Sequence, residues 1–201
     1  MTIHSVPSIG SLWLMPRLHQ FVARFPNIDL RVSGSPEFAN FVSDHVDIDI
    51  RYGKPNWKDL QVVPLMKEEV MPLCSPRLLE GPDAIRTPSD LDRATLIELD
   101  SAIMGWNDWF EINGLDPPKS GQHLHFDRSV MSIQAGVDGL GIILDSTTLA
   151  ARELADGRLV RPFADSMRSL EVTGHFLVYP KANAKIPIVA EFLAWVRELQ
   201  T

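Results

Sequence analysis

Short hydroxyl side chains and a glycine stand at the entrance of the first predicted helix. The turn Ser8-Ile9-Gly10-Ser11 follows a candidate strand at residues 3–6 and precedes an apolar series with helical spacing. The first backbone N–H groups of a helix have no partner within it, so together with hydroxyl groups they can bind a carboxylate or an amide. An ordinary helix cap is the alternative role for this turn.

Arg51 is the second residue that could bind an anion, because it ends the third predicted strand. Its guanidinium group can donate two parallel hydrogen bonds to one carboxylate. The alternative is a structural ion pair with Asp47 or Glu37.

Two histidines could begin a metal site. His123 and His125 lie two residues apart on a predicted strand and therefore share one face. The sequence places no third ligand beside them, so ordinary surface or core histidines are favoured, and we expect no metal and no cofactor.

Other residues that could support catalysis stand in the wrong context. Gly139-Leu140-Gly141 lies between a predicted helix and a following strand, whereas a dinucleotide-binding loop requires a strand before it and a helix after it. Cys74 lies in an apolar segment with no histidine nearby, which predicts a buried structural thiol. The sequence also lacks a Gly-x-Ser-x-Gly elbow, and the pair Trp106 and Trp109 fits core or interface packing. We therefore expect no enzyme.

Composition limits the class of protein further. The 201 residues are 45% hydrophobic and 22% charged, which is typical of a globular protein, and carry a net charge of -7. An acidic chain without a basic patch is a poor direct partner for nucleic acid. One cysteine, no signal-peptide pattern and no apolar run of about 18 residues predict a cytoplasmic protein that does not contact the membrane.

The elements of the first part alternate. Leu14, Leu18 and Phe21 belong to a helical series in which Pro16 cannot donate to Leu12, so either the regular helix begins near Pro16 or a distorted turn precedes it. Strands follow at residues 28–32 and 46–50 with a helix at 37–44 between them. This alternation predicts a parallel sheet with helical crossovers.

The later segments repeat the pattern. Residues 60–74 predict a long strand or a hairpin, and a domain boundary follows near residue 75. A strand at residues 172–179 is expected to return to the first lobe, where a final helix from Pro187 covers the sheet. The fold class is α/β, with lobe I formed by residues 1–75 and 174–201 and lobe II by residues 76–173. The expected elements of lobe II are a short helix at residues 89–91, strands at 96–99, 123–126 and 142–144, helices at 106–112 and 130–137, and a helix capped by Ser146 and ended by Gly157.

Seven segments occur in a fixed order along nearly the whole chain. They are Trp13-Leu14-Met15-Pro16-Arg17-Leu18, Phe25-Pro26-Asn27-Ile28, Val46-Asp47-Ile48-Asp49-Ile50-Arg51-Tyr52-Gly53, Leu73-Cys74-Ser75-Pro76, Ala135-Gly136-Val137-Asp138-Gly139-Leu140-Gly141-Ile142, Leu154-Ala155-Asp156-Gly157-Arg158-Leu159-Val160 and Leu177-Val178-Tyr179-Pro180. Together they resemble the effector-binding domain of LysR-type transcription regulators. The opening with Trp13 and the Ile-Arg-Tyr-Gly element resemble the branch that contains the glycine-cleavage activator and the β-lactamase regulators.

The resemblance implies two Rossmann-like lobes joined by two crossing strands, similar to type 2 periplasmic binding proteins. It also implies that a small effector, such as an amino acid, a small carboxylate or a peptide-like compound, binds between the lobes. The contacts implied by position are Ser8, Ile9, Gly10, Ser11, Ser35, Arg51, Asp100, Ser101, Asp127 and Ser129. Asp127 could instead cap the helix that begins near Ser129.

The family also implies partners. This domain is expected to form a homodimer, and a tetramer at full length, through the first helix and its equivalent in the second lobe. DNA is expected to bind only through a helix-turn-helix domain that would precede Met1. The alternative from another class is a solute-binding protein of a transport system, which shares the two-lobed architecture.

Overall fold

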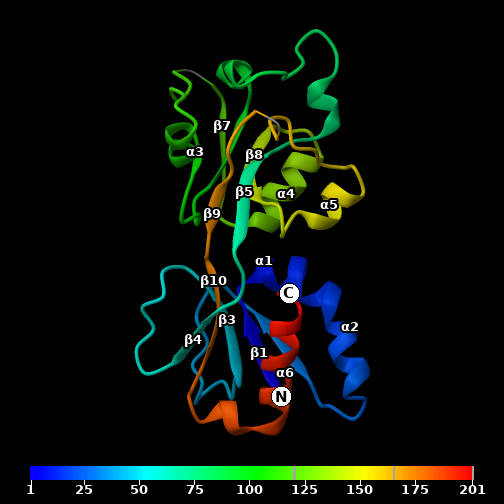
Figure 1. Ribbon diagram of the computed structural model, residues 1–201, viewed down its shortest axis with the longest axis vertical. Helices are drawn as coiled ribbons and strands as arrows, with labels where there is room; N and C mark the ends of the chain where they lie inside the picture. The colour runs from blue at the N-terminus through cyan, green and yellow to red at the C-terminus, as the bar shows by residue number, and fades with distance from the viewer. Residues whose placement is uncertain (120, 165, 201) are drawn as a thin grey trace. The chain divides into compact units, whose positions relative to one another are not determined.

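The computed structural model describes residues 1–119, 121–164 and 166–200, and the chain forms two α/β units (Figure 1). Unit 1 contains Met1–Lys67 and Thr173–Thr201, and unit 2 contains Glu68–Val172. Thr201, the end of the predicted lobe I, lies outside the described residues, as do Ser120 and Asp165 of the predicted lobe II.

The first crossing between the units comes earlier in the chain than the boundary predicted near residue 75. Strand β5 (Glu68–Leu73) pairs with strands β8 and β9, which both belong to the sheet of unit 2. Strand β4 (Gln61–Pro64) pairs with β10 in the sheet of unit 1. Residues 60–74 are therefore neither one strand nor a hairpin, because the chain leaves one sheet and enters the other within this segment.

The sheet of unit 1 has the strand order β2-β1-β3-β10-β4. Strands β1, β2 and β3 are parallel to one another, and β10 is antiparallel to both β3 and β4. The predicted parallel arrangement is thus confirmed for the first three strands. The three parallel strands are β1 (Thr2–Ser5), β2 (Arg31–Gly34) and β3 (Ile48–Tyr52), and the strand that returns from unit 2 is β10 (His175–Tyr179).

The helix predicted at residues 37–44 is wrong, because this segment forms turns. The Asn40 side chain accepts hydrogen bonds from the backbone N–H groups of Val42 and Ser43, at 3.0 and 3.1 Å. The Asp44 carboxylate accepts from the Asn40 N–H at 2.8 Å. Such local side-chain bonds offer the backbone an alternative to the helical ladder.

A continuous helical segment follows β1 and consists of α1 (Pro7–Ile9), the π-helix η1 (Gly10–Leu14) and α2 (Met15–Arg24). At the end of η1 the Met15 N–H donates to the Gly10 carbonyl, five residues back. Pro16 has no N–H to donate to Leu12, and the wider π turn accommodates this missing bond. Both expectations at Pro16 are met, because the regular helix begins at Met15 and a distorted π turn precedes it.

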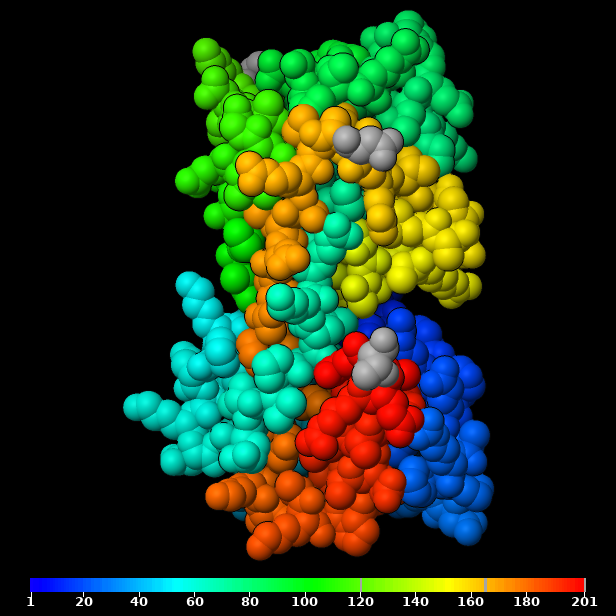
Figure 2. Space-filling view, viewed as in Figure 1, coloured from blue at the N-terminus to red at the C-terminus, as the bar shows by residue number. Residues whose placement is uncertain are grey.

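The core of unit 1 lies where α2 and the C-terminal helix α6 (Pro187–Glu198) cover one face of the sheet. The ring of Phe21 lies 5.3 Å from those of Phe192 and Trp195, and all three side chains are buried. Figure 2 shows α6 in red beside the blue N-terminal helices. The predicted cover of the first sheet by the last helix is confirmed.

Gly10 allows this helix to approach β1 closely. A Cβ atom at Gly10 would lie only 2.4 Å from Oγ of the buried Ser5. We expect Gly10→Ala to lower the free energy of unfolding by about 1–3 kcal/mol, because the helix or Ser5 must shift. Urea unfolding measures the loss. Gly114→Ala is the matched control, because Gly114 has a φ of 65° and open space around it, so this substitution introduces backbone strain without steric crowding. A Gly10→Ala chain as stable as the parent would contradict the expectation.

The sheet of unit 2 has the order β7-β6-β8-β5-β9, in which β6 is parallel to β7 and β8, and β5 is antiparallel to β8 and β9. Helix α3 covers one face, where Trp106 and Trp109 are buried in the core as the spacing predicted. Helix α4 covers the other face and brings Gly136 against Ile143. The elements of unit 2 are β6 (Leu96–Leu99), α3 (Trp106–Ile112), β7 (His123–Phe126), α4 (Ser129–Val137), β8 (Ile142–Ser146), α5 (Ala151–Ala155) and β9 (Leu170–Val172).

Short 3-10 helices complete the chain at Pro76–Leu79, Pro88–Arg93 and Asn183–Lys185. The second of them is the short helix that the sequence predicted around Asp90. Across the described residues, no helix has the length and apolar character needed to cross a bilayer.

Cys74 is fully buried, as predicted, and burial raises the pKa of its thiol to about 12. The thiolate is the nucleophilic form, so we expect the folded chain to resist 5,5′-dithiobis(2-nitrobenzoic acid) at pH 8. The thiol should react within the mixing time in 6 M guanidinium chloride, which serves as the control. Rapid labelling of the folded chain would show that Cys74 is accessible.

Candidate functional site

In unit 1, the predicted serines and Gly10 gather where parallel strands end. The carboxyl ends of β1 and β2 are adjacent, and the Ser35 N–H donates to the Ser5 carbonyl at 3.2 Å. Ser8, Ile9 and Gly10 are buried in the helical segment that leaves this edge, and Ser11 is exposed. Val6 rather than Ser8 occupies the N-cap position.

Arg51 forms the predicted kind of ion pair, but with a different partner. Its Nε atom donates to Oδ2 of Asp49 at 2.7 Å, and Nη2 donates to the Ala39 carbonyl at 3.1 Å. Asp47, one of the expected partners, instead accepts from the Thr2 N–H. The guanidinium group is buried and holds the loop after β2, which favours a structural role over ligand binding.

The two anion-binding candidates of unit 1 also lie on different faces of its sheet. Asp49 is paired with His4, and side chains alternate along a strand, so His4, Asp49 and Arg51 share one face. Ser5 points to the other face, against which Gly10 packs. The structure therefore brings the Ser35 backbone to the edge where β1 ends, but the Ser35 hydroxyl group lies beside His4 on the face that carries Arg51, away from the helix entrance.

A buried polar network that sequence reasoning missed surrounds Arg51. Oδ1 of Asp49 lies 2.7 Å from Nδ1 of His4, and Nε2 of His4 lies 3.1 Å from Oγ of Ser35. Ser35 in turn donates to the Glu37 carbonyl at 3.1 Å. The network links β1, β3 and the loop after β2, so it fixes the position of Ser35.

Three aromatic rings enclose the Arg51 guanidinium group. Its central carbon lies 4.6 Å from the centre of the Phe38 ring and 5.5 Å from those of Phe41 and Trp57. Cation–π attraction of this kind stabilises a desolvated guanidinium. A signal for the network was present in the sequence, because Asp49 interrupts an otherwise apolar strand between Ile48 and Ile50.

In unit 2, the four predicted residues gather at one edge of the sheet. Asp100 and Ser101 follow β6, Asp127 follows the parallel strand β7, and Ser129 begins α4. Oγ of Ser101 donates to the Asp127 carbonyl at 3.0 Å, which joins the two strand ends.

A basic side chain lies beside each of the two carboxylates of this group, Asp100 and Asp127. Nδ1 of His125 lies 3.0 Å from Oδ1 of Asp100, and Nη1 of Arg128 lies 3.1 Å from Oδ2 of Asp127. Arg128 is the N-cap residue of α4, and the Asp127 carboxylate pairs with it.

Asp145 is the functional candidate of unit 2 that the sequence analysis missed. It is the penultimate residue of β8, it is 3% exposed, and its Oδ1 accepts from the Ser146 N–H at 2.8 Å. Burial raises the pKa of its carboxyl group to about 6, and the nearby Glu68 carboxylate also raises it. The Ser146 N–H and the hydroxyl groups of Ser129 and Ser132 lower the pKa in part. The sequence signal was an aspartate at the end of the apolar run 142–144.

The histidines of β7 pair with carboxylates of β6. His123 lies 3.7 Å from Glu98, and His125 contacts Asp100 as described. Within residues 1–119, 121–164 and 166–200, no three histidine, cysteine or acidic residues lie close enough to hold a metal ion.

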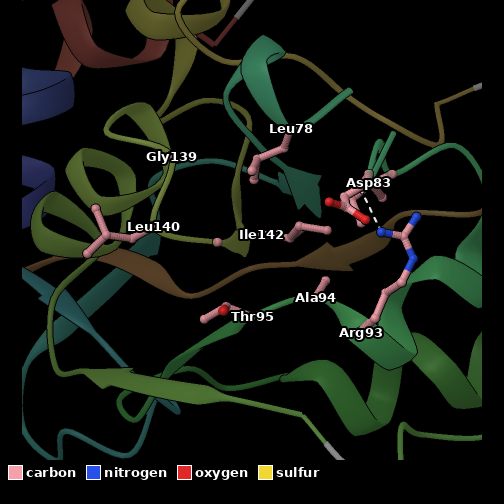
Figure 3. Close-up of a pocket in the computed structure, with 10 residues that line it drawn as sticks. Leu78, Asp83, Arg93, Ala94, Thr95, Gly139, Leu140 and Ile142 are labelled. Atoms are coloured by element: carbon pink, nitrogen blue, oxygen red, sulfur yellow. Dashed lines mark hydrogen bonds between the residues drawn. The ribbon is translucent and has the colours of Figure 1, made fainter. Parts of the chain in front are cut away.

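A cavity of about 250 Å³ lies at the opposite edge of the unit 2 sheet, beside Thr95 before β6 and Ile142 at the start of β8 (Figure 3). Its one arginine, Arg93, donates to the carbonyls of Asp83 and Ala84 at 2.7 and 2.8 Å. The guanidinium group thus holds the wall of the cavity, and none of the predicted site residues lines it.

Comparison with protein families gives one match that spans the whole chain. The model of the LysR substrate binding domain matches residues 1–201. The chain belongs to this family.

Individual relatives agree with this assignment of the LysR substrate-binding domain. The HTH-type transcriptional regulator PerR of Escherichia coli is 42% identical over 98% of this chain and 65% of its own length. The glycine cleavage system transcriptional activator of the same species is 34% identical over 98% of this chain and 63% of its own length. The chain thus spans a little less than two thirds of these relatives.

Solved structures support the fold. The effector domain of the transcriptional regulator AmpR of Pseudomonas aeruginosa superposes with a TM-score of 0.82 at 28% identity, covering 98% of this chain and 94% of that one. This LysR substrate-binding domain therefore has the type 2 periplasmic-binding-protein-like fold that the sequence predicted. The similarity to the glycine-cleavage activator and to AmpR confirms the predicted branch, and all these relatives favour a regulator over a transport protein.

Proposed function

We propose that this domain senses a small polar effector and thereby controls the activity of a bacterial transcription regulator. The observation that carries the proposal is the gathering of polar residues at the carboxyl ends of parallel strands, the edge at which open α/β sheets bind ligands. In unit 1 these residues are Ser8 to Ser11 with Ser35, and in unit 2 they are Asp100, Ser101, Asp127 and Ser129.

The chemistry of the unit 1 group fits an anionic part of an effector. Ser8 and Ile9 stand at the start of the helical segment, where backbone N–H groups attract negative charge. An amino acid, a small carboxylate or a peptide-like compound carries such a group. Arg51 contributes indirectly, because it orders the loop that carries Ser35.

Control of transcription requires a second domain and self-association. The relatives are named as HTH-type regulators, so we place DNA binding in a helix-turn-helix domain and the whole protein in the bacterial cytoplasm. Exposed apolar side chains on α2 and α4 favour a homodimer through these helices, and a tetramer of the whole protein. Met15 is 54% exposed and Met131 is 48% exposed.

Thermal unfolding of this chain against amino acids, small organic acids and short peptides tests effector binding. A ligand at 100 times its dissociation constant stabilises the folded state by about 2.7 kcal/mol, which is a measurable shift. Ser8→Ala and Ser129→Ala should each reduce the shift, whereas Ser43→Ala, at an exposed serine in the turn after β2, should leave it unchanged. A shift that survives both site variants would contradict the proposed site.

Analytical ultracentrifugation tests the dimer. Met131→Asp should move this chain from dimer to monomer, because a charge would be buried in the contact. Val42→Asp replaces an 84% exposed side chain outside both helices and should leave the sedimentation coefficient unchanged. A dimer that persists in Met131→Asp would exclude α4 from the interface.

A further inference from the structure

A cavity of unit 2 that the proposed function does not use is large enough for a small molecule. Its volume of about 250 Å³ lies just below the range of about 300–1,000 Å³ found for sites of drug-sized ligands. A compound of the size of an amino acid suits such a volume. The cavity lies where β6 and β8 begin, whereas Asp100 and Ser101 follow the end of β6. It is therefore separate from the proposed effector residues.

The walls of this cavity are largely aliphatic. The side chains of Leu78, Ile85, Leu140 and Ile142 line it. Ile85 and Ile142 are buried, but Leu140 is 48% exposed. An apolar group that covers Leu140 removes its surface from water, which favours the binding of a ligand with an aliphatic part.

An acidic and a basic side chain also line the cavity. Figure 3 shows Asp83 and Arg93 at one side of it and Leu140 at the other. An arginine side chain has five N–H groups. Arg93 donates three hydrogen bonds, to the carbonyls of Asp83 and Ala84 and to the Asp90 carboxylate. In the described part of the chain, its other two N–H groups and the Asp83 carboxylate have no partner, so the cavity offers both donors and an acceptor.

We propose that this cavity binds a small aliphatic amino acid as a second ligand. Its ammonium group pairs with the Asp83 carboxylate, and its carboxylate accepts from the remaining N–H groups of Arg93. One carbon atom separates the two charged groups of an amino acid, and Asp83 and Arg93 are also neighbours, since Nη1 of Arg93 lies 2.7 Å from the Asp83 carbonyl oxygen. The aliphatic side chain then covers Leu140 and Ile142. The inference goes beyond the proposed effector site and does not depend on it.

NMR titration of the ¹⁵N-labelled chain with leucine tests this inference. Gly139 and Gly141 line the cavity, so their amide signals should shift. Three related compounds each lack one feature of leucine: free glycine lacks the aliphatic side chain, 4-methylpentanoate lacks the amine and 3-methylbutylamine lacks the carboxylate. We expect free glycine to bind at least about 10-fold more weakly than leucine. The other two should each bind about 5-fold more weakly, because ion pairs with exposed side chains contribute little.

Substitutions locate the contacts. Asp83→Asn should weaken the binding of leucine by about 5-fold but should not weaken 4-methylpentanoate, which has no ammonium group, whereas a merely structural role of Asp83 would affect both compounds. Leu140→Gln should weaken both compounds, because both lose an apolar contact. Asp116→Asn is the matched control, because Asp116 is exposed and does not line the cavity, and it should bind leucine as the parent does.

The outcomes separate this inference from the proposed function. If leucine at millimolar concentration shifts neither glycine amide, or if all four compounds bind equally, the inference is wrong. If Asp83→Asn keeps the affinity for leucine, the paired charges do not recognise the ligand and the inference is also wrong. Leucine binding that is lost in Ser8→Ala and kept in Asp83→Asn would contradict the second site while supporting the proposed effector site.

Discussion

Replacing Asp145 with asparagine is expected to stabilise the chain at pH 8 by up to about 3 kcal/mol. Burial raises the pKa of this carboxyl group to about 6 from the ordinary value of 3.8, so ionising it is harder in the folded chain than in the unfolded one. Each unit of difference in pKa corresponds to about 1.4 kcal/mol. Asparagine has a similar shape and carries no charge at any of these pH values.

The sign of the pH dependence follows from proton binding. Between pH 6 and pH 3.8 the folded chain holds a proton on Asp145 that the unfolded chain has released, so this residue favours folding increasingly as the pH falls. The advantage of Asp145→Asn should therefore shrink from its full size above pH 7 to nearly zero at pH 4. Urea unfolding of both chains at pH 8, 6 and 4 measures this difference, and titration of the other carboxyl groups cancels in the comparison. A difference in stability that stays constant across this pH range would show that folding does not raise the pKa of Asp145.

Replacing Asp49 with alanine is expected to destabilise the chain by about 3–5 kcal/mol. The carboxylate lies between His4 and Arg51, at 2.7 Å from each, and its side chain is 1% exposed. Removing one partner of a buried ion pair leaves an uncompensated charge, which is among the largest effects of a single substitution. The Ala39 N–H also loses its acceptor, so the loop after β2 should loosen.

A double variant distinguishes loss of the charge pair from loss of packing. Asp49→Ala combined with Arg51→Met removes both charges and keeps an apolar side chain against Phe38 and Trp57. We expect this double variant to be more stable than Asp49→Ala alone, by urea unfolding monitored with circular dichroism. An Asp49→Ala chain within 1 kcal/mol of the parent would show that the buried network contributes little to stability.

Local patterns were sufficient for most elements of unit 2. The predicted bounds of β6, α3 and β7 agree with the structure, because each lies between clear turn signals and has one dominant periodicity. The final helix was also recognisable from its proline start and apolar face. The helix predicted at residues 37–44 failed because the side chains of Asn40 and Asp44 bond to the local backbone.

Resemblance to a family assigned ligand contacts by position, and these contacts remain predictions whose residues the structure now places. Ser35 and the four residues of unit 2 do reach the expected strand ends, since parallel strands bring their carboxyl ends to one edge. Arg51 lies near the end of its strand as expected, but strand alternation directs its side chain to the face opposite the helix entrance, where Asp49 binds it. No local pattern in the sequence shows which buried carboxylate an arginine will meet.

The sequence by itself determined the family, the α/β class and the positions of most strands and helices, because these depend on local periodicity and on motifs in a fixed order. The tertiary structure decided where the chain crosses between its two sheets, since pairing of β5 with β8 and β9 depends on residues far away in the sequence. It also decided that the Asp49 carboxylate meets three partners, namely His4, Arg51 and the Ala39 N–H, whereas the Asp145 carboxyl group is buried beside the hydroxyl groups of Ser129 and Ser132. Burial and hydrogen bonding of a carboxylate depend on which distant segments surround it, and only the folded chain fixes those neighbours.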